Sequence, residues 1–282
     1  MTFTTATGPA SRRAPADAAN APGAAATATR PTLPPRTPFP AAFGAVYAGQ
    51  VARARVARVP LLFVAAFQSI GIMVLLRGVV DSGNRTTGAQ VVAGSAVLVV
   101  AFVALNLLAQ RFGELRSAGA LDYYRTLPVP GSAVVLGTAA SYATFAVPGT
   151  IVTAVSGLAL YGLPFGGLWL LAPVTVLAGA SLAGVGAAIG LLAPKPELAT
   201  VAGQLGMTAA LFFGIIPGSR FPEVLRPVRD LVPSTYAADA LAAAFRVSVN
   251  WATVSLDLAV CAAIAVATLG IAVLALRRAG SG

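Results

Sequence analysis

The chain has 282 residues, of which 57% are hydrophobic and 10% charged, and its mean hydropathy is +0.82. Soluble domains carry about 25% charged residues, so this composition excludes an ordinary soluble protein and indicates a polytopic membrane protein. The net charge of +10 does not indicate nucleic-acid binding, because the basic residues lie in short segments between apolar runs. With one Cys and no His, disulfide frameworks and His-based sites are also excluded.

The first 58 residues divide into two segments. Residues 1–37 are rich in Ala, Thr, Pro and Arg and have little to bury, which predicts a disordered cytoplasmic tail. Residues 38–58 carry apolar side chains at helical spacing with Arg53 and Arg55 beside them. This pattern predicts an amphipathic interfacial helix, with a plain extension of the first span as the alternative.

Six apolar runs follow, each near the ~20 residues that cross ~30 Å of hydrocarbon. They predict an all-α integral membrane fold whose transmembrane domain covers residues 59–278. The six spans are expected at about 60–80, 89–109, 133–161, 168–192, 198–217 and 253–276. Small residues four positions apart in the fourth run, such as Gly186 and Gly190, favour close helix packing within the chain over a dimer contact.

The distribution of basic residues predicts the orientation. If both termini are cytoplasmic, thirteen of the nineteen Lys and Arg residues lie on the cytoplasmic side, as the positive-inside rule requires. Residues 110–131, called the polar segment below, are then cytoplasmic. The 218–250 segment lies outside and, because it is too charged to cross, is expected to form short helices at the interface.

The sequence lacks the residues that several functions need. It has no GxxxxGK[ST] phosphate-binding loop, so the chain is not expected to hydrolyse nucleotides itself. The expected spans contain no ionisable residue at the midplane, which disfavours ion coupling, and no paired acids or metal ligands that would indicate an enzyme. Hydrogen bonding across helices is the favoured role for the remaining polar residues of the spans, which are Gln68, Ser69, Asn106, Ser181 and Gln204.

The polar segment has a more specific pattern than a solvated loop. A helix is expected from about Glu114 to Tyr124, with Asp122 and Arg125 three residues apart. The Leu-Pro-Val-Pro sequence that contains Pro128 then ends the helix, because each proline pushes its preceding residue out of the α region. Such a rigid joint before the third span is suited to receive a push from a soluble partner. The alternative is a charged loop that only fixes orientation.

Two motifs carry a resemblance to a known family. The first is matched at Glu114, Gly119, Leu121, Asp122, Leu127, Pro128 and Val129. The second, just before the last span, is matched at Pro233, Tyr236, Asp239, Ala240 and Leu241. In order and spacing these motifs resemble permeases of the ABC type 2 exporter family over residues 40–278. Ala242 departs from the pattern, since the family often has a basic residue there.

This resemblance implies the membrane subunit of an ATP-driven exporter in the plasma membrane of a bacterium. Such a permease forms a dimer with a second copy or a paralogue, contacts membrane lipid and moves a hydrophobic or amphiphilic compound of the drug, lipid or glycan class. A separate cytoplasmic ATP-binding-cassette ATPase would bind ATP and Mg, so no cofactor and no catalytic residue are expected in this chain. The alternatives are an ion-coupled secondary transporter and a non-transporting membrane scaffold.

The resemblance also assigns roles to residues. The ATPase-coupling residues would be Glu114, Arg116, Gly119, Leu121, Asp122, Arg125 and Pro128. The extracellular gate would contain Pro233, Tyr236 and Asp239. Asn106 and Gln204 become candidates for lining the substrate path.

Overall fold

The computed structural model describes residues 37–79, 85–216, 222–246 and 249–278, and in these ranges it contains helices and no strand. The expected all-α class is therefore confirmed for the described part of the chain. Except for Thr37, the predicted tail lies outside the described residues. Side chains are likewise not described at 54–59, 61, 62, 79, 122, 125 and 226.

The first helix, α1, runs without a break from Phe39 to Val79. It covers both the predicted interfacial helix and the predicted first span, although Pro60 lies inside it. Proline removes one helical hydrogen bond, and in membrane helices neighbouring groups can satisfy the freed carbonyl. The apolar part of α1 among the described residues is Phe63–Gly78, which is shorter than a full span.

Five further helices are long and apolar enough to cross a membrane, counting the described residues only. They are Arg85–Ser117, Gly131–Tyr161 (α5), Phe165–Leu192 (the 3-10 helix η2, Phe165–Leu170, and α6, Leu171–Leu192), Pro196–Ile215 (α7) and Trp251–Arg278 (α10). They overlap the second to sixth predicted spans. The total of six spans and the cytoplasmic placement of both termini stay predictions.

The second span forms the centre of the helical core. It consists of α2 (Arg85–Ala101), a π-helix η1 (Phe102–Leu107) and α3 (Leu108–Ser117). Every residue from Thr87 to Ala101 is buried, as expected for a helix that is apolar on all sides. The neighbours α5, α7 and α9 (Pro233–Ala244) pack around α2, so the second span is enclosed within the chain.

Glycines of α6 allow this helix to touch the second span. A Cβ added at Gly186 would lie 2.1 Å from the carbonyl oxygen of Ala104, and one at Gly190 would lie 2.4 Å from that of Ala109. No side chain fits at these distances, so only glycine permits the approach. The prediction that these small residues pack within the chain is confirmed.

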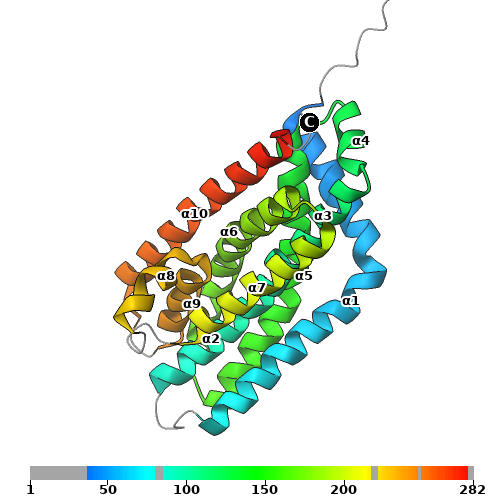
Figure 1. Cartoon of the computed structure of the whole chain (residues 1–282). Coiled ribbons are helices and arrows are strands. Elements are labelled where there is room, and N and C mark those ends of the chain that lie inside the picture. Colours follow the sequence, from blue (N-terminus) through cyan, green and yellow to red (C-terminus); the bar gives the residue numbers. More distant parts are fainter. Residues whose placement is uncertain (1–36, 80–84, 217–221, 247–248, 279–282) are drawn as a thin grey trace, which may run out of the picture. The chain divides into compact units, whose positions relative to one another are not determined.

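Short helices connect α7 to α10, as expected for the 218–250 segment. They are η4 (Glu223–Leu225), α8 (Arg226–Leu231) and α9 (Pro233–Ala244). Figure 1 shows α8 and α9 at one end of α10, and α4 (Ala120–Thr126) near the other end, where α10 finishes. The two motifs found in the sequence therefore lie at opposite ends of the helices.

Candidate functional site

The polar segment forms two helices, and the single helix expected from Glu114 to Tyr124 is wrong. α3 ends at Ser117, and α4 begins at Ala120. Between them, Gly119 has a φ of 65°, and its N–H donates to the carbonyl of Arg116 at 3.1 Å. Glycine adopts this left-handed conformation readily, which explains why a glycine ends α3.

Arg116 attaches the polar segment to the end of α6. Its Nη1 donates to the carbonyl oxygens of Leu191 and Ala193, both at 2.8 Å. Leu191 lies in the last turn of α6 and Ala193 is its C-cap, where helical partners run out and a cation is favoured by the helix dipole. Arg116 therefore fixes α3 against α6, a contact that the sequence did not indicate.

The start of α7 lies against the same part of α3. A Cβ added at Gly113 would be 3.0 Å from Cβ of Ala199 and 3.4 Å from Cα of Pro196. On the inner side of α3, Phe112 is fully buried and Leu115 is nearly so. A displacement of α3 would therefore reach both α6 and α7.

The outer side of the polar segment is open to solvent. The Glu114 side chain is 62% exposed and pairs loosely with Arg111 at 3.4 Å. Tyr123 in α4 is also exposed, and its ring meets that of Tyr124 edge-on at 6.3 Å. A charged group and an aromatic ring thus face outward at the end of the second span.

The remaining predicted coupling residues are Leu121, Asp122, Arg125 and Pro128. Leu121 is buried, whereas the side chains of Asp122 and Arg125 lie outside the described residues. The carbonyl of Pro128 accepts a hydrogen bond from the N–H of Thr37 at 2.9 Å. The Leu-Pro-Val-Pro turn is therefore held against the beginning of α1.

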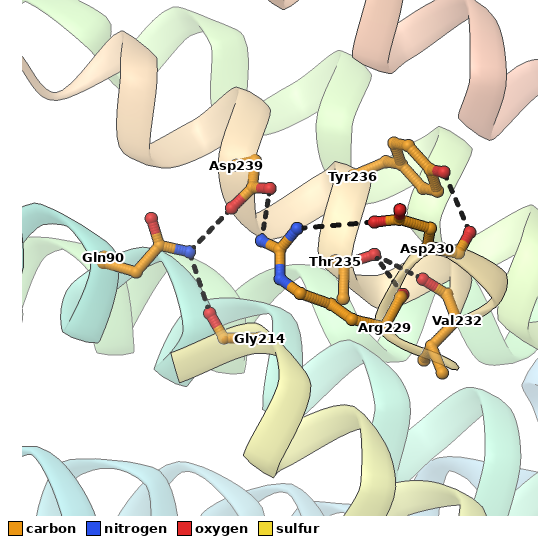
Figure 2. A network of polar contacts seen from close by, with 8 residues as sticks. All are labelled: Gln90, Gly214, Arg229, Asp230, Val232, Thr235, Tyr236 and Asp239. Atoms are coloured by element: carbon orange, nitrogen blue, oxygen red, sulfur yellow. Dashed lines mark hydrogen bonds and ion pairs between the residues drawn. The ribbon is translucent and has the colours of Figure 1, made fainter. Parts of the chain in front are cut away.

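A second polar cluster lies at the other end of the second span, around Asp239 of α9. Figure 2 shows Gln90 and Arg229 approaching the Asp239 carboxylate from different sides. Gln90 Nε2 donates to Asp239 Oδ1 at 2.9 Å and to the carbonyl of Gly214 at 3.0 Å. Arg229 Nη2 donates to Asp239 Oδ2. The Asp239 carboxylate thereby connects α9 to α2 and α8, and the Gln90 amide connects α2 to α7.

The Arg229–Asp239 ion pair is mostly withdrawn from water. The Arg229 side chain is 11% exposed and that of Asp239 is 32% exposed. Asp230 lies on the solvent side of the same guanidinium, 3.8 Å from Nη1. Because buried charges are costly when unpaired, this pair favours one position of α8 against α9.

Tyr236 strengthens the connection between α8 and α9. Its hydroxyl donates to the carbonyl of Asp230 at 2.8 Å, and Thr235 Oγ1 donates to the carbonyl of Arg229 at 3.1 Å (Figure 2). Burial raises the pKa of Tyr236 above 10.0, and the negative charge of Asp230 raises it further. The tyrosine therefore keeps its proton, and with it this hydrogen bond, beyond the usual pH.

The three predicted gate residues all lie on α9, and two of them belong to this cluster. Asp239 lies at the centre of the cluster, and Tyr236 donates a hydrogen bond to Asp230 at its solvent side. Pro233 is buried as the first residue of α9, and its carbonyl accepts a weak hydrogen bond from Cys261 Sγ at 3.8 Å. Their role as a gate stays a prediction.

The two candidates for the substrate path have different surroundings. Asn106 lies in the π-helix, is 6% exposed and accepts a hydrogen bond from Gln110 Nε2 at 2.7 Å. Gln204 is exposed on α7. Gly203, beside Gln204 in the chain, packs against the Asn106 backbone, so the two helices touch while the two amide side chains have different environments.

Sequence reasoning missed two residues of the cluster around Asp239. Gln90 was available as a signal, since it is a polar residue inside an apolar run. Arg229 was counted only for topology, because its partner lies ten residues along the chain and on another helix. By contrast, Ser69 donates to the carbonyl of Ser95, which is the expected hydrogen bond between spans.

The five long apolar helices, with polar clusters near both ends of an enclosed span, define a multi-pass integral membrane protein. A search of curated proteins returns no match. The family model described as ABC-2 family transporter protein matches residues 59–274, so the chain belongs to this family. The resemblance seen in the two motifs is therefore confirmed. Membership identifies a membrane subunit of an ABC transporter and implies an ATPase partner.

Proposed function

We propose that the chain is the permease of an ATP-driven exporter that moves a hydrophobic or amphiphilic compound out of a bacterial cell through the plasma membrane. Two copies, or one copy and a paralogue, would form the transport unit within the lipid. ATP and Mg would be bound by the separate ATPase. Each cycle would alternate between an inward-open and an outward-open state.

The observation that carries the coupling part of the proposal is the Arg116 contact with the end of α6. The polar segment presents Glu114 and Tyr123 to solvent while Arg116 binds the Leu191 and Ala193 carbonyls. A partner that moves the exposed side of this segment would also move α6, and α7 through the close contact at Gly113. The movement would then be passed to the second span and to α6 and α7 together.

At the other end, the cluster around Asp239 would respond to that movement. It connects the ends of α2 and α7 with α8 and α9. A rotation of α7 relative to α2 would separate Gly214 from Gln90 and loosen the support of Asp239. We infer that α8 and α9 form the outer gate and that this cluster holds the gate closed between cycles.

Site-directed cross-linking tests the coupling proposal. Glu114→Cys, made in a Cys261→Ala background, places a thiol on the exposed side of the polar segment. In native membranes it is expected to capture an ATPase with a phosphate-binding loop, identified by mass spectrometry. Ser255 is exposed near the start of α10, at the end opposite to the polar segment. Ser255→Cys is therefore the matched control and should capture no ATPase.

Transport measurements complete the test. Glu114→Lys reverses an exposed charge and should uncouple ATP hydrolysis from efflux while the protein stays in the membrane. Full efflux in this variant would contradict the coupling role. Labelling of Glu114→Cys only from outside the cell would refute the orientation as well.

A further inference from the structure

A small cavity lies between α1 and the turn that leads into α5. Its volume is about 220 Å³. The side chains lining it include Ala42, Val46, Gln50, Arg53, Tyr124 and Leu127. Beside it α1 packs tightly on α5, where a Cβ at Gly137 would be 3.0 Å from Val46, and Tyr124 of α4 forms part of the cavity wall.

The cavity contains a polar group that the protein leaves unsatisfied. Gln50 is only 4% exposed, and among the described residues its Oε1 has no hydrogen-bond partner. A buried acceptor of this kind is rare in native proteins and calls for an explanation such as a bound ligand. The ligand must offer an N–H or O–H donor.

Arg53 adds the second requirement. It lies three residues after Gln50, on the same side of α1, and lines the same cavity. Its planar guanidinium can donate two hydrogen bonds to the oxygens of one anion, such as a phosphate. The rest of the lining is mainly alanine, valine and leucine, which suits a ligand with an apolar portion. A free ion in water would gain nothing from that surface.

We propose that this cavity binds the headgroup of a glycerophospholipid. The phosphodiester lies against the Arg53 guanidinium, and an ammonium or hydroxyl of the headgroup donates to Gln50 Oε1. Basic pockets beside membrane helices are known sites for lipid headgroups. Phosphatidylethanolamine and phosphatidylglycerol carry the required donor, whereas phosphatidylcholine does not. The site therefore selects lipids whose headgroup carries an N–H or O–H donor. The bound headgroup holds α1 against the Leu-Pro-Val-Pro turn.

A neighbouring cavity provides a matched control. It also measures about 220 Å³ and shares Tyr124 and Val129, but its basic residue is Arg277 of α10. None of its lining side chains is among the buried polar groups without a partner. Loss of Arg277 changes the local charge as much as loss of Arg53, without touching the Gln50 site.

Native mass spectrometry of the delipidated full chain tests the site. Equal amounts of the three lipids, with identical acyl chains, are added to the wild type and to variants. The wild type is expected to bind phosphatidylethanolamine and phosphatidylglycerol roughly tenfold more tightly than phosphatidylcholine, the effect of about one hydrogen bond to a charged or strongly polar group. Gln50→Leu should remove this preference and leave phosphatidylcholine binding unchanged.

The other variants separate the two contacts. Arg53→Gln should weaken all three lipids by roughly fivefold, and Arg277→Gln should not change the preference. Gln50→Glu keeps an acceptor and adds charge, so it should favour the ethanolamine lipid over the glycerol lipid. This variant reports on the site even if Gln50→Leu does not fold.

Three outcomes would overturn the proposal. Equal binding of all three lipids by the wild type would mean that no headgroup donor reaches Gln50 Oε1. A preference that survives Gln50→Leu would place the selectivity elsewhere. Displacement of phosphatidylethanolamine by an equal concentration of soluble glycerophosphoethanolamine would exclude the lipid as the source of the headgroup. None of these measurements needs the ATPase or transport, so the lipid site and the proposed function fail separately.

Discussion

Breaking the ion pair between Arg229 and Asp239 should destabilise the protein far more than removing both partners together. Asp239→Leu leaves the 11%-exposed Arg229 side chain without its carboxylate. Removing one partner of a buried ion pair costs about 3–5 kcal/mol. The lower end of that range applies here, because Asp230 remains 3.8 Å away on the solvent side. At about 2–4 °C per kcal/mol for a protein of this size, Tm should fall by about 6–12 °C.

The double variant makes the test specific. Arg229→Met combined with Asp239→Leu removes both charges and fills the space with apolar groups, a change that is often nearly neutral. Its Tm should therefore lie at least about 5 °C above that of Asp239→Leu alone. Asp230→Asn is the control, since this 62%-exposed carboxylate should contribute about 0–1 kcal/mol.

Thermal unfolding of the purified protein in detergent is measured for the wild type and the three variants. The unfolding of membrane proteins is often irreversible, so Tm values are compared at one scan rate. Equal losses in Asp239→Leu and the double variant would refute the reasoning, because the cost would then come from packing and not from the broken ion pair. A loss of less than about 2 °C in Asp239→Leu would show that the pair is effectively exposed.

Two further predictions concern packing and pH. Gly186→Ala should greatly reduce the yield of folded protein, because its Cβ would lie 2.1 Å from the Ala104 carbonyl oxygen, whereas Gly270→Ala, with nothing within 4 Å, should express normally; equal gel-filtration profiles would contradict this. The raised pKa of Tyr236 means that its stabilising contribution is complete below pH 10 and is lost as pH rises through the folded-state pKa. The Tm advantage of the wild type over Tyr236→Phe should therefore shrink above pH 10, and an advantage constant to pH 11 would show that Tyr236 does not titrate there.

Local patterns were enough to predict the helical class and the position of the long apolar helices. Hydropathy reports the cost of burying polar groups, and that cost depends on composition more than on tertiary contacts. The close packing at Gly186 was also visible, because small residues four apart share one helix face. These features follow from short stretches of sequence.

Contacts between distant segments could not be predicted in the same way. Nothing near Arg116 in the sequence indicates the α6 carbonyls 75 and 77 residues away. The sequence placed Gly119 inside a predicted helix. In the structure Gly119 is left-handed and lies in the turn between α3 and α4. Gln90 donates a hydrogen bond to Asp239, which lies 149 residues further along the chain. Polar contacts of this kind depend on which helices become neighbours in the fold. The spacing of residues within one helix carries no information about this.

The π-helix at Phe102–Leu107 gives the second span a changeable register. Its last bond joins the N–H of Leu108 to the carbonyl of Val103, five residues back, so one more residue is accommodated than in a regular helix. If the same six residues became regular α-helix, the extra residue would turn α3 by about 100° relative to α2. Arg116 would then face away from Leu191, although every side chain on both halves had been kept. A change from π to α hydrogen bonding, with no change of sequence, thus separates two ways of connecting the ends of this span.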